Sequence, residues 1–121
     1  MSTRSAIGML TWDGKVKAVY CHWDGYPQGV GRTLRDLYKD VFKVAGLINN
    51  NKAISSLGKN VKESKFIESD KWQALTFDTP DAMIEHYKTN WCEYFYLFCD
   101  DYWKVSKGGS FRKMRTIKKV K

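Results

Sequence analysis

The dipeptide Asp13-Gly14 constrains this chain most, because it separates two runs that each have the composition of a β-strand. Residues 6–12 are rich in strand formers, and residues 16–23 alternate between two faces. Asp-Gly is favoured in the two-residue turns that join antiparallel strands, since glycine adopts a positive φ at little cost. The sequence therefore predicts a β-hairpin over residues 6–23.

Two helices are predicted after the hairpin. Apolar residues recur with a 3.6-residue period from residue 30 to residue 48, which is typical of a helix with one buried face. The polar residues 49–71 lack such a period and are predicted to form a long loop, followed by a short strand at 72–77. Thr79 is a good N-cap and Pro80 suits a first helical turn, so a second helix is expected to run to residue 91.

The C-terminal quarter predicts a strand meander. Residues 94–99 form an aromatic run, Asp100-Asp101 forms a turn, and residues 102–106 return as a second strand. We favour a third strand within residues 111–120, although a helix also fits, and residues 107–121 can instead form a partly disordered basic tail. The order of elements predicts a single α+β domain over residues 1–121. Its expected architecture is an antiparallel sheet, made of the N-terminal hairpin and the C-terminal meander, with two helices packed on one face.

Positive charge is concentrated at the C-terminal end. The formal net charge is +8, from 21 Lys and Arg against 13 Asp and Glu, and residues 104–121 hold eight cations and no acid. Residues 1–103 are therefore neutral, with 13 charges of each sign. A segment of one sign attracts polyanions, although a solvated tail is the simpler alternative. The predicted basic patch consists of Lys104, Arg112, Lys113, Arg115, Lys118 and Lys119.

Cysteine usage favours a cytoplasmic protein. Cys21, Cys92 and Cys99 are an odd number and lack the spacing of a metal site, so a reducing compartment is expected, with no metal and no cofactor. No run approaches the roughly 18 apolar residues of a membrane span, and the N-terminus lacks the apolar segment of a secretion signal. We expect no association with a membrane.

The run Tyr-Cys-His-Trp-Asp-Gly-Tyr-Pro-Gln-Gly-Val-Gly at residues 20–31 is the strongest candidate for a binding site. It lies where the hairpin meets the first predicted helix. Glycines before a helix let backbone N–H groups approach an anion, and arginine can bind a phosphate or carboxylate through two hydrogen bonds. The alternative is that the glycines only permit a tight turn. The predicted ligand-binding residues are Arg4, His22, Asp24, Tyr26, Gly29, Gly31 and Arg32.

The same run contains the ingredients of a nucleophilic enzyme, namely Cys21, His22 and Asp24. Strand alternation places Cys21 and His22 on opposite faces, so these two side chains are not expected to contact each other directly. Asp24 shares a face with His22 and could orient its ring, and His86 on the second helix could instead meet Cys21. A buried cysteine and a structural histidine are the simpler interpretation.

Several motifs resemble those of small accessory proteins encoded by tailed bacteriophages. They are Ser-Thr-Arg-Ser at residues 2–5, Tyr-Cys-His-Trp-Asp-Gly-Tyr-Pro at 20–27, Gly-Val-Gly at 29–31 and Ser-Ser-Leu-Gly at 55–58. The resemblance covers about the first half of the chain. It implies a protein that acts in the host cytoplasm, with countering host defences as one expected role, but it implies no particular activity.

These observations predict a non-enzymatic binding protein. Its expected ligand is anionic, either a nucleotide-type molecule or nucleic acid, and is bound through the strand-to-helix turn and the basic C-terminal end. Direct inhibition of a host defence protein and a small cysteine/histidine-dependent enzyme are the alternatives. A homo-oligomer is compatible with the sequence.

Overall fold

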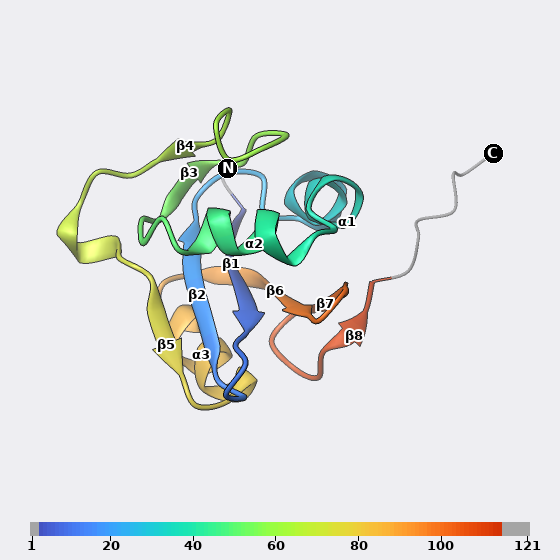
Figure 1. Ribbon diagram of the computed structural model, residues 1–121. Coiled ribbons are helices and arrows are strands. Elements are labelled where there is room, and N and C mark those ends of the chain that lie inside the picture. The colour runs from blue at the N-terminus through green and yellow to red at the C-terminus, as the bar shows by residue number, and fades with distance from the viewer. Residues whose placement is uncertain (1–2, 115–121) are drawn as a thin grey trace.

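The computed structural model describes residues 3–114, which form a mixed sheet with helices on both faces (Figure 1). Within these residues eight strands belong to one sheet, in the order β4-β3-β2-β1-β6-β7-β8, and β5 pairs separately with β2. The strands are β1 (Arg4–Leu10), β2 (Val16–Cys21), β3 (Ile54–Ser56), β4 (Lys65–Phe66), β5 (Leu75–Phe77), β6 (Cys92–Cys99), β7 (Tyr102–Ser106) and β8 (Arg112–Lys113). The helices are α1 (Arg32–Leu37), α2 (Val41–Ile48) and α3 (Pro80–Lys88).

The predicted hairpin is confirmed. β1 and β2 pair antiparallel from Ser5↔Cys21 to Leu10↔Val16, and the Thr11 N–H donates to the Lys15 carbonyl across the turn. Gly14 has a φ of +83°, the conformation for which glycine is selected. The expected pairing of β6 with β7 is present as well, and β8 adds a third, short strand to this meander.

The α+β class is confirmed, but the sheet is mixed rather than purely antiparallel. β6 pairs parallel with β1, with Ser5 opposite Tyr94 and Ile7 opposite Tyr96. β1 therefore lies between β2 and β6 in the sheet. β2 also pairs parallel with β3 at Cys21↔Ile54. The β1–β6 pair joins the N-terminal hairpin and the C-terminal meander into one sheet.

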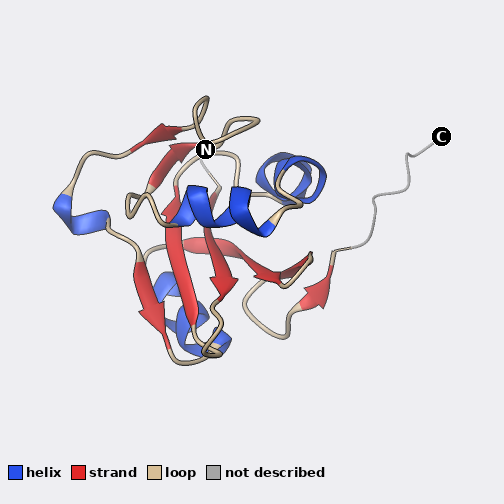
Figure 2. Ribbon diagram, viewed as in Figure 1, coloured by secondary structure: helices blue, strands red, loops and turns tan. Residues whose placement is uncertain are grey.

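The prediction that two helices pack on one face is wrong. Ile7 and Tyr96 point to one face, where they pack with α1 and α2 through side chains such as Leu34 and Leu47. Ala6 and Phe95 point to the other face, which α3 covers through Met83, Ile84 and Tyr87 (Figure 2). Successive residues of a strand alternate between faces, so the nearly continuous apolar run in β6 reflects burial on both sides.

The single long helix predicted over residues 30–48 is divided in two. α1 ends at Leu37, and α2 begins after Asp40, whose side chain caps it by accepting a hydrogen bond from the Phe42 N–H at 2.8 Å. Between them, the Tyr38 carbonyl accepts a hydrogen bond from the Trp103 indole N–H at 2.9 Å. The apolar period continues through the break because both helices pack against the same side of the sheet.

Other boundaries also differ from the sequence prediction. The predicted loop 49–71 contains β3 and β4, and it leads into a short 3₁₀ turn, η2 (Asp70–Trp72). The strand expected at 72–77 covers only Leu75–Phe77, and α3 ends at Lys88 instead of residue 91. Within 111–120, β8 occupies two residues, and positions 115–120 lie outside the described residues.

On its outer edge β2 has a segment that is unpaired between two partner strands, and the candidate site lies beside this segment. β5 pairs with residues 16–18 of β2, and β3 pairs with Cys21 at its end. Tyr20 lies between these two partners. The chain that connects β4 to β5 passes here, and the Trp72 ring packs on Tyr20 with 4.6 Å between ring centroids. Trp72 also accepts a hydrogen bond from the Ala53 N–H through its carbonyl, which fixes this connection to the sheet.

Candidate functional site

The strand-to-helix turn is closed by its own hydrogen bonds. Within η1 (Pro27–Gly31), a single π-helical turn, the Gly29 N–H donates to the Tyr26 carbonyl at 2.9 Å and the Val30 N–H donates to the Asp24 carbonyl at 2.8 Å. The Gly31 N–H also donates to the Tyr26 carbonyl, at 3.4 Å. The expectation that these amides would cradle an anion is therefore wrong, because their hydrogens are already used.

The glycines of this turn permit close packing. Tyr96, fully buried in β6, donates its hydroxyl hydrogen to the Gly25 carbonyl at 2.7 Å. A Cβ at Gly25 would lie 2.8 Å from the Thr3 carbonyl oxygen, and one at Gly31 would lie 3.1 Å from the Tyr96 ring. The turn is thus a packed elbow, and the simpler interpretation of its glycines describes it well.

The predicted ligand-binding residues separate into two groups. Asp24, Tyr26 and Arg32 stay with the glycines at the elbow, where the Tyr26 hydroxyl points to Asp24 at 3.4 Å. Arg4 and His22 lie elsewhere and line a common cavity. This second group follows from the hairpin register, which places the start of β1 next to the end of β2.

The proposed cysteine nucleophile is not accessible. Cys21 is fully buried, and burial raises the pKa of its thiol to about 12, so the reactive thiolate is disfavoured at neutral pH. Its sulfur lies 3.8 Å from the Trp23 carbonyl, whereas the His22 Nδ1 bonds to the Tyr20 hydroxyl at 2.9 Å. His86 packs against the rings of Phe77 and Tyr87. This geometry contradicts a Cys21–His22–Asp24 catalytic site.

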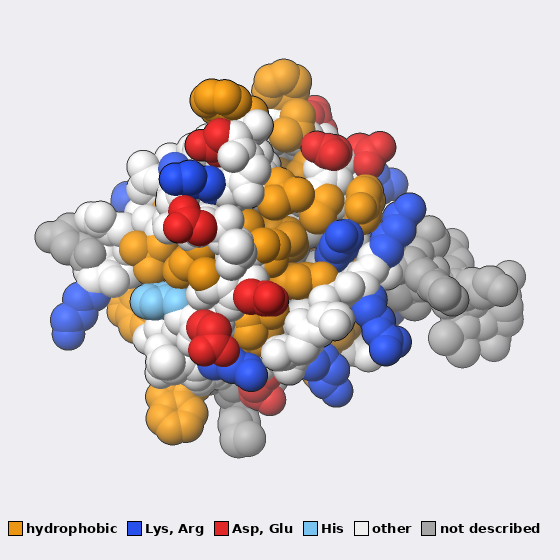
Figure 3. Space-filling view, turned by 90° about the horizontal axis from the view of Figure 1, so that it is seen from below, with side chains coloured by type: hydrophobic (Ala, Val, Ile, Leu, Met, Phe, Trp, Pro, Cys, Tyr) orange, Lys and Arg blue, Asp and Glu red, His pale blue; other side chains and the backbone are white. Residues whose placement is uncertain are grey.

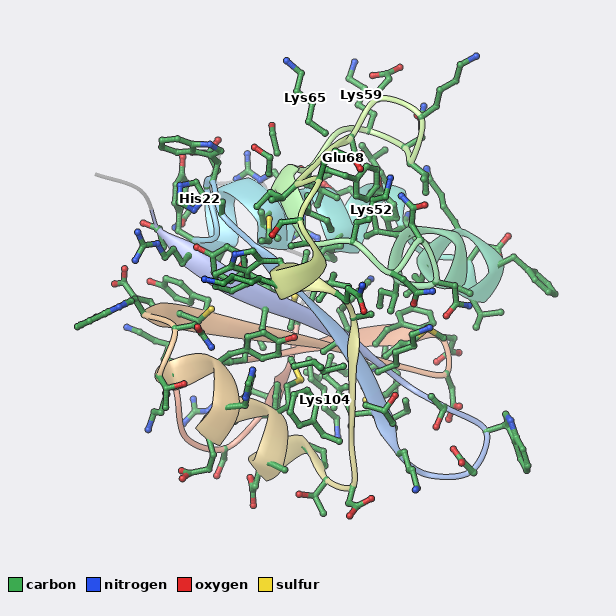
Figure 4. The ribbon with its side chains drawn as sticks, turned by 90° about the vertical axis from the view of Figure 1, so that its left-hand side faces the viewer. His22, Lys52, Lys59, Lys65, Glu68 and Lys104 are labelled. Carbon is green, nitrogen blue, oxygen red and sulfur yellow. The ribbon has the colours of Figure 1, made fainter. Side chains whose placement is uncertain are left out.

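The cavity that contains Arg4 and His22 has a volume of about 500 Å³. We call it the Arg4 lobe. Tyr20, Trp72 and Asn90 form one wall, and Arg4, His22, Ile67 and Trp91 complete it. His22 follows β2 at the end farthest from the hairpin turn (Figure 4). None of these lining residues is acidic.

Arg4 brings a cation with an unsatisfied N–H donor to this cavity. Its Nε is buried and has no hydrogen-bond partner within residues 3–114. Burial also raises the pKa of the neighbouring Tyr20 to about 12, with the positive charge of Arg4 opposing that rise, so Tyr20 remains a neutral hydrogen-bonding group. The lobe therefore combines a cation with an aromatic wall and an imidazole.

Trp91 supplies an exposed ring at the margin of the lobe. It follows α3 with a φ of 67°, the left-handed conformation that glycine and asparagine usually occupy at a helix end, and 75% of its surface is exposed. Trp72, Asn90 and Trp91 were not among the predicted site residues, because position 72 only begins a predicted strand and position 91 only ends a predicted helix. The signal that could have identified Trp91 is a tryptophan at the helix terminus, where a glycine is common.

A second cavity, of about 370 Å³, adjoins the first. It shares Tyr20, Trp72 and Asn90 with the Arg4 lobe and is completed by Lys71, Gln73, Leu75, His86 and Tyr87. We call it the Lys71 lobe, and the two lobes together the aromatic groove. It extends over the unpaired segment of the β2 edge and along the C-terminal half of α3.

The basic patch is only partly within the described residues. Lys104 lies opposite Lys113 in the β7–β8 pair, and their amines lie 5.9 and 4.8 Å from the Tyr102 ring centroid. Arg112 lines another cavity, of about 370 Å³, together with Pro27 and Tyr94. Lys and Arg side chains gather on the side of β7 and β8 (Figure 3), apart from His22 (Figure 4). Arg115, Lys118 and Lys119 fall outside residues 3–114.

Two features are absent from residues 3–114. No group of three or more His, Cys, Asp or Glu side chains in this range could hold a metal ion. No helix in the same range is long and apolar enough to cross a bilayer. Comparisons with known protein families, with curated proteins and with solved structures found no match to this chain.

Proposed function

We propose that the chain is a phage-type accessory protein that binds a small anion with a planar ring, of the nucleotide class, in the Arg4 lobe. The observation that carries this proposal is the buried Arg4 Nε, which lacks a hydrogen-bond partner within the described residues. A buried N–H donor that loses water without gaining an acceptor is costly. A phosphate supplies both the acceptor and the opposite charge.

The aromatic side chains around Arg4 support a ligand with a ring. Trp72 and Tyr20 form a packed wall, and Trp91 offers a ring that is mostly exposed. Stacking a base on such a ring contributes roughly 1–3 kcal/mol. The left-handed backbone of Trp91 costs free energy for a residue with a Cβ, and such outliers are concentrated at ligand sites. Contact with a ligand would explain a tryptophan at this position.

His22 adds a directional polar contact. Its Nδ1 is bonded to the Tyr20 hydroxyl at 2.9 Å, which leaves Nε2 as the ring nitrogen available to a ligand. The Asn90 side chain also lines the lobe and offers amide groups that suit a base edge. The accessory role that such binding would serve is removal of a nucleotide-type signal from the host cytoplasm.

Isothermal titration calorimetry tests the proposal. The probes are the four ribonucleoside 5′-monophosphates, with the corresponding nucleosides and inorganic phosphate as partial ligands. We expect at least one monophosphate to bind more tightly than its nucleoside. Arg4→Gln should weaken that binding about ten- to a hundredfold, the value of a charged hydrogen bond.

Arg32→Gln is the matched control, because Arg32 is exposed at the elbow and lines neither lobe. It should leave the affinity unchanged. Absence of binding by every monophosphate at low salt would refute the proposal. A loss of affinity in the Arg32 variant alone would indicate that the ligand binds at the elbow instead of in the Arg4 lobe.

Nucleic acid is the second candidate ligand, because two lysines face each other in the β7–β8 pair. Like charges at Lys104 and Lys113 repel, and a phosphate between them would relieve that repulsion. Binding at this surface should weaken steeply with salt. Lys104→Gln should lower by about one the number of counterions released on binding, which the slope of log affinity against log salt concentration reports. Titration of a labelled single strand at 50 and 200 mM salt measures this; an affinity that does not change with salt argues against it.

A further inference from the structure

We infer that the ligand of the aromatic groove has two planar rings joined through phosphate, as in a dinucleotide. This inference rests on the proposed function and specifies its ligand. It begins with the adjacency of the two lobes, which have volumes of about 500 and 370 Å³ and share Tyr20, Trp72 and Asn90. A ligand of one ring occupies one lobe and leaves the other to water.

The two lobes repeat the same chemistry. The Arg4 lobe has one cation and one imidazole, Arg4 and His22. The Lys71 lobe likewise has one cation and one imidazole, Lys71 and His86. Among the described side chains that line the two lobes, none is acidic. Two similar half-sites side by side suit a ligand made of two similar, negatively charged halves.

The shared wall is suited to the middle of such a ligand. Trp72 lines both lobes and is held against Tyr20 at 4.6 Å between centroids, so each half of the ligand meets an aromatic surface. Asn90 is fixed at the end of α3 by a hydrogen bond from its Nδ2 to the His86 carbonyl at 3.3 Å. The linking phosphate would pass between the cations of the two lobes, with a base on each side of it.

Joining two halves raises affinity because the second half binds as an intramolecular event. A dinucleotide should therefore bind at least tenfold more tightly than either mononucleotide, with one dinucleotide per chain. The experiment is calorimetry of the full chain with a mononucleotide, the linear dinucleotide of the same base and its cyclic form. Comparison of the linear with the cyclic dinucleotide shows which of the two forms the groove binds more tightly.

Affinities of variants show which half of the dinucleotide binds in which lobe. Lys71→Gln should weaken the dinucleotide about tenfold and leave the mononucleotide that binds at Arg4 unchanged, whereas Arg4→Gln should weaken both. Lys88→Gln is the control, because Lys88 directly follows the lining residues His86 and Tyr87 in α3 but lines neither lobe. It should affect neither ligand.

The outcomes separate the two proposals. Equal affinities for mono- and dinucleotide, with no effect of Lys71→Gln, would overturn the two-ring inference while the Arg4 site stands. Failure of every nucleotide to bind would overturn both. Tighter binding of a dinucleotide that depends on Arg4 and Lys71 but not on Lys88 would establish the inference.

Discussion

Replacement of Gly29 by alanine distinguishes a packed elbow from an anion cradle. A Cβ at Gly29 would lie 2.5 Å from the Asp24 carbonyl oxygen, which also accepts the Val30 N–H at 2.8 Å. Relief of this clash must move one backbone segment away from the other. Overpacking of this kind costs about 1–3 kcal/mol, and the displaced hydrogen bond adds about 0.5–1.5 kcal/mol.

Alanine also restricts the unfolded chain, which offsets about 0.4–1 kcal/mol of this loss. We therefore expect Gly29→Ala to lower the free energy of unfolding by about 1–3 kcal/mol. For a chain of 121 residues, 1 kcal/mol corresponds to about 4 °C, so the melting temperature should fall by about 4–12 °C. Differential scanning calorimetry measures the shift.

Gly109→Ala provides the matched control, since a Cβ there meets nothing within 4 Å. It should leave the melting temperature unchanged or raise it slightly. Below its melting temperature the Gly29 variant should still bind nucleotide at the Arg4 lobe. A Gly29 variant as stable as the wild type, or one that folds normally but loses ligand, would refute the packed-elbow interpretation.

Three other predictions concern buried groups. Tyr96→Phe should lower the free energy of unfolding by about 1–3 kcal/mol, because the Gly25 carbonyl loses its hydroxyl donor, and urea titration against the exposed control Tyr26→Phe measures this. Burial raises the pKa of Cys21 and Cys92 to about 12, so the folded chain binds more protons than the unfolded chain above pH 9 and stability must fall as pH rises through that range. The loss is about 1.4 kcal/mol per thiol per pH unit, and equal urea midpoints at pH 8 and pH 10 would contradict it. Iodoacetamide at pH 8 should modify Cys21, Cys92 and Cys99 only after unfolding, as mass spectrometry would detect, because all three are buried.

The parts of the fold that follow from local sequence were predictable. Asp13-Gly14 specifies the first hairpin through the backbone of its own turn, and the N-cap at Thr79 is confirmed by a hydrogen bond from the Ala82 N–H at 3.1 Å. The break between α1 and α2 was not predictable, because it involves the Tyr38 carbonyl and the indole of Trp103, far away in the sequence.

The candidate site was predictable only where the hairpin defines it. The register of β1 and β2 places Arg4 near His22, and both are among the predicted ligand-binding residues. Trp72 and Trp91 reach the same cavity from segments that the sequence does not relate to the hairpin or to each other. The parallel pairing of β6 with β1 and the packing of α3 on the sheet, where the Tyr87 hydroxyl donates to the Ala18 carbonyl, bring the end of α3 to this position.

That parallel pairing also has a consequence for synthesis on the ribosome. β1 is translated before its second neighbour, β6, which begins at Cys92, so the two strands cannot pair until the residues between them have been synthesised. Until then the nascent hairpin has an unoccupied side, which can recruit strands from other molecules. Contacts between such distant segments slow folding. A fragment that stops before residue 92 should therefore aggregate, because β1 would lack its parallel partner.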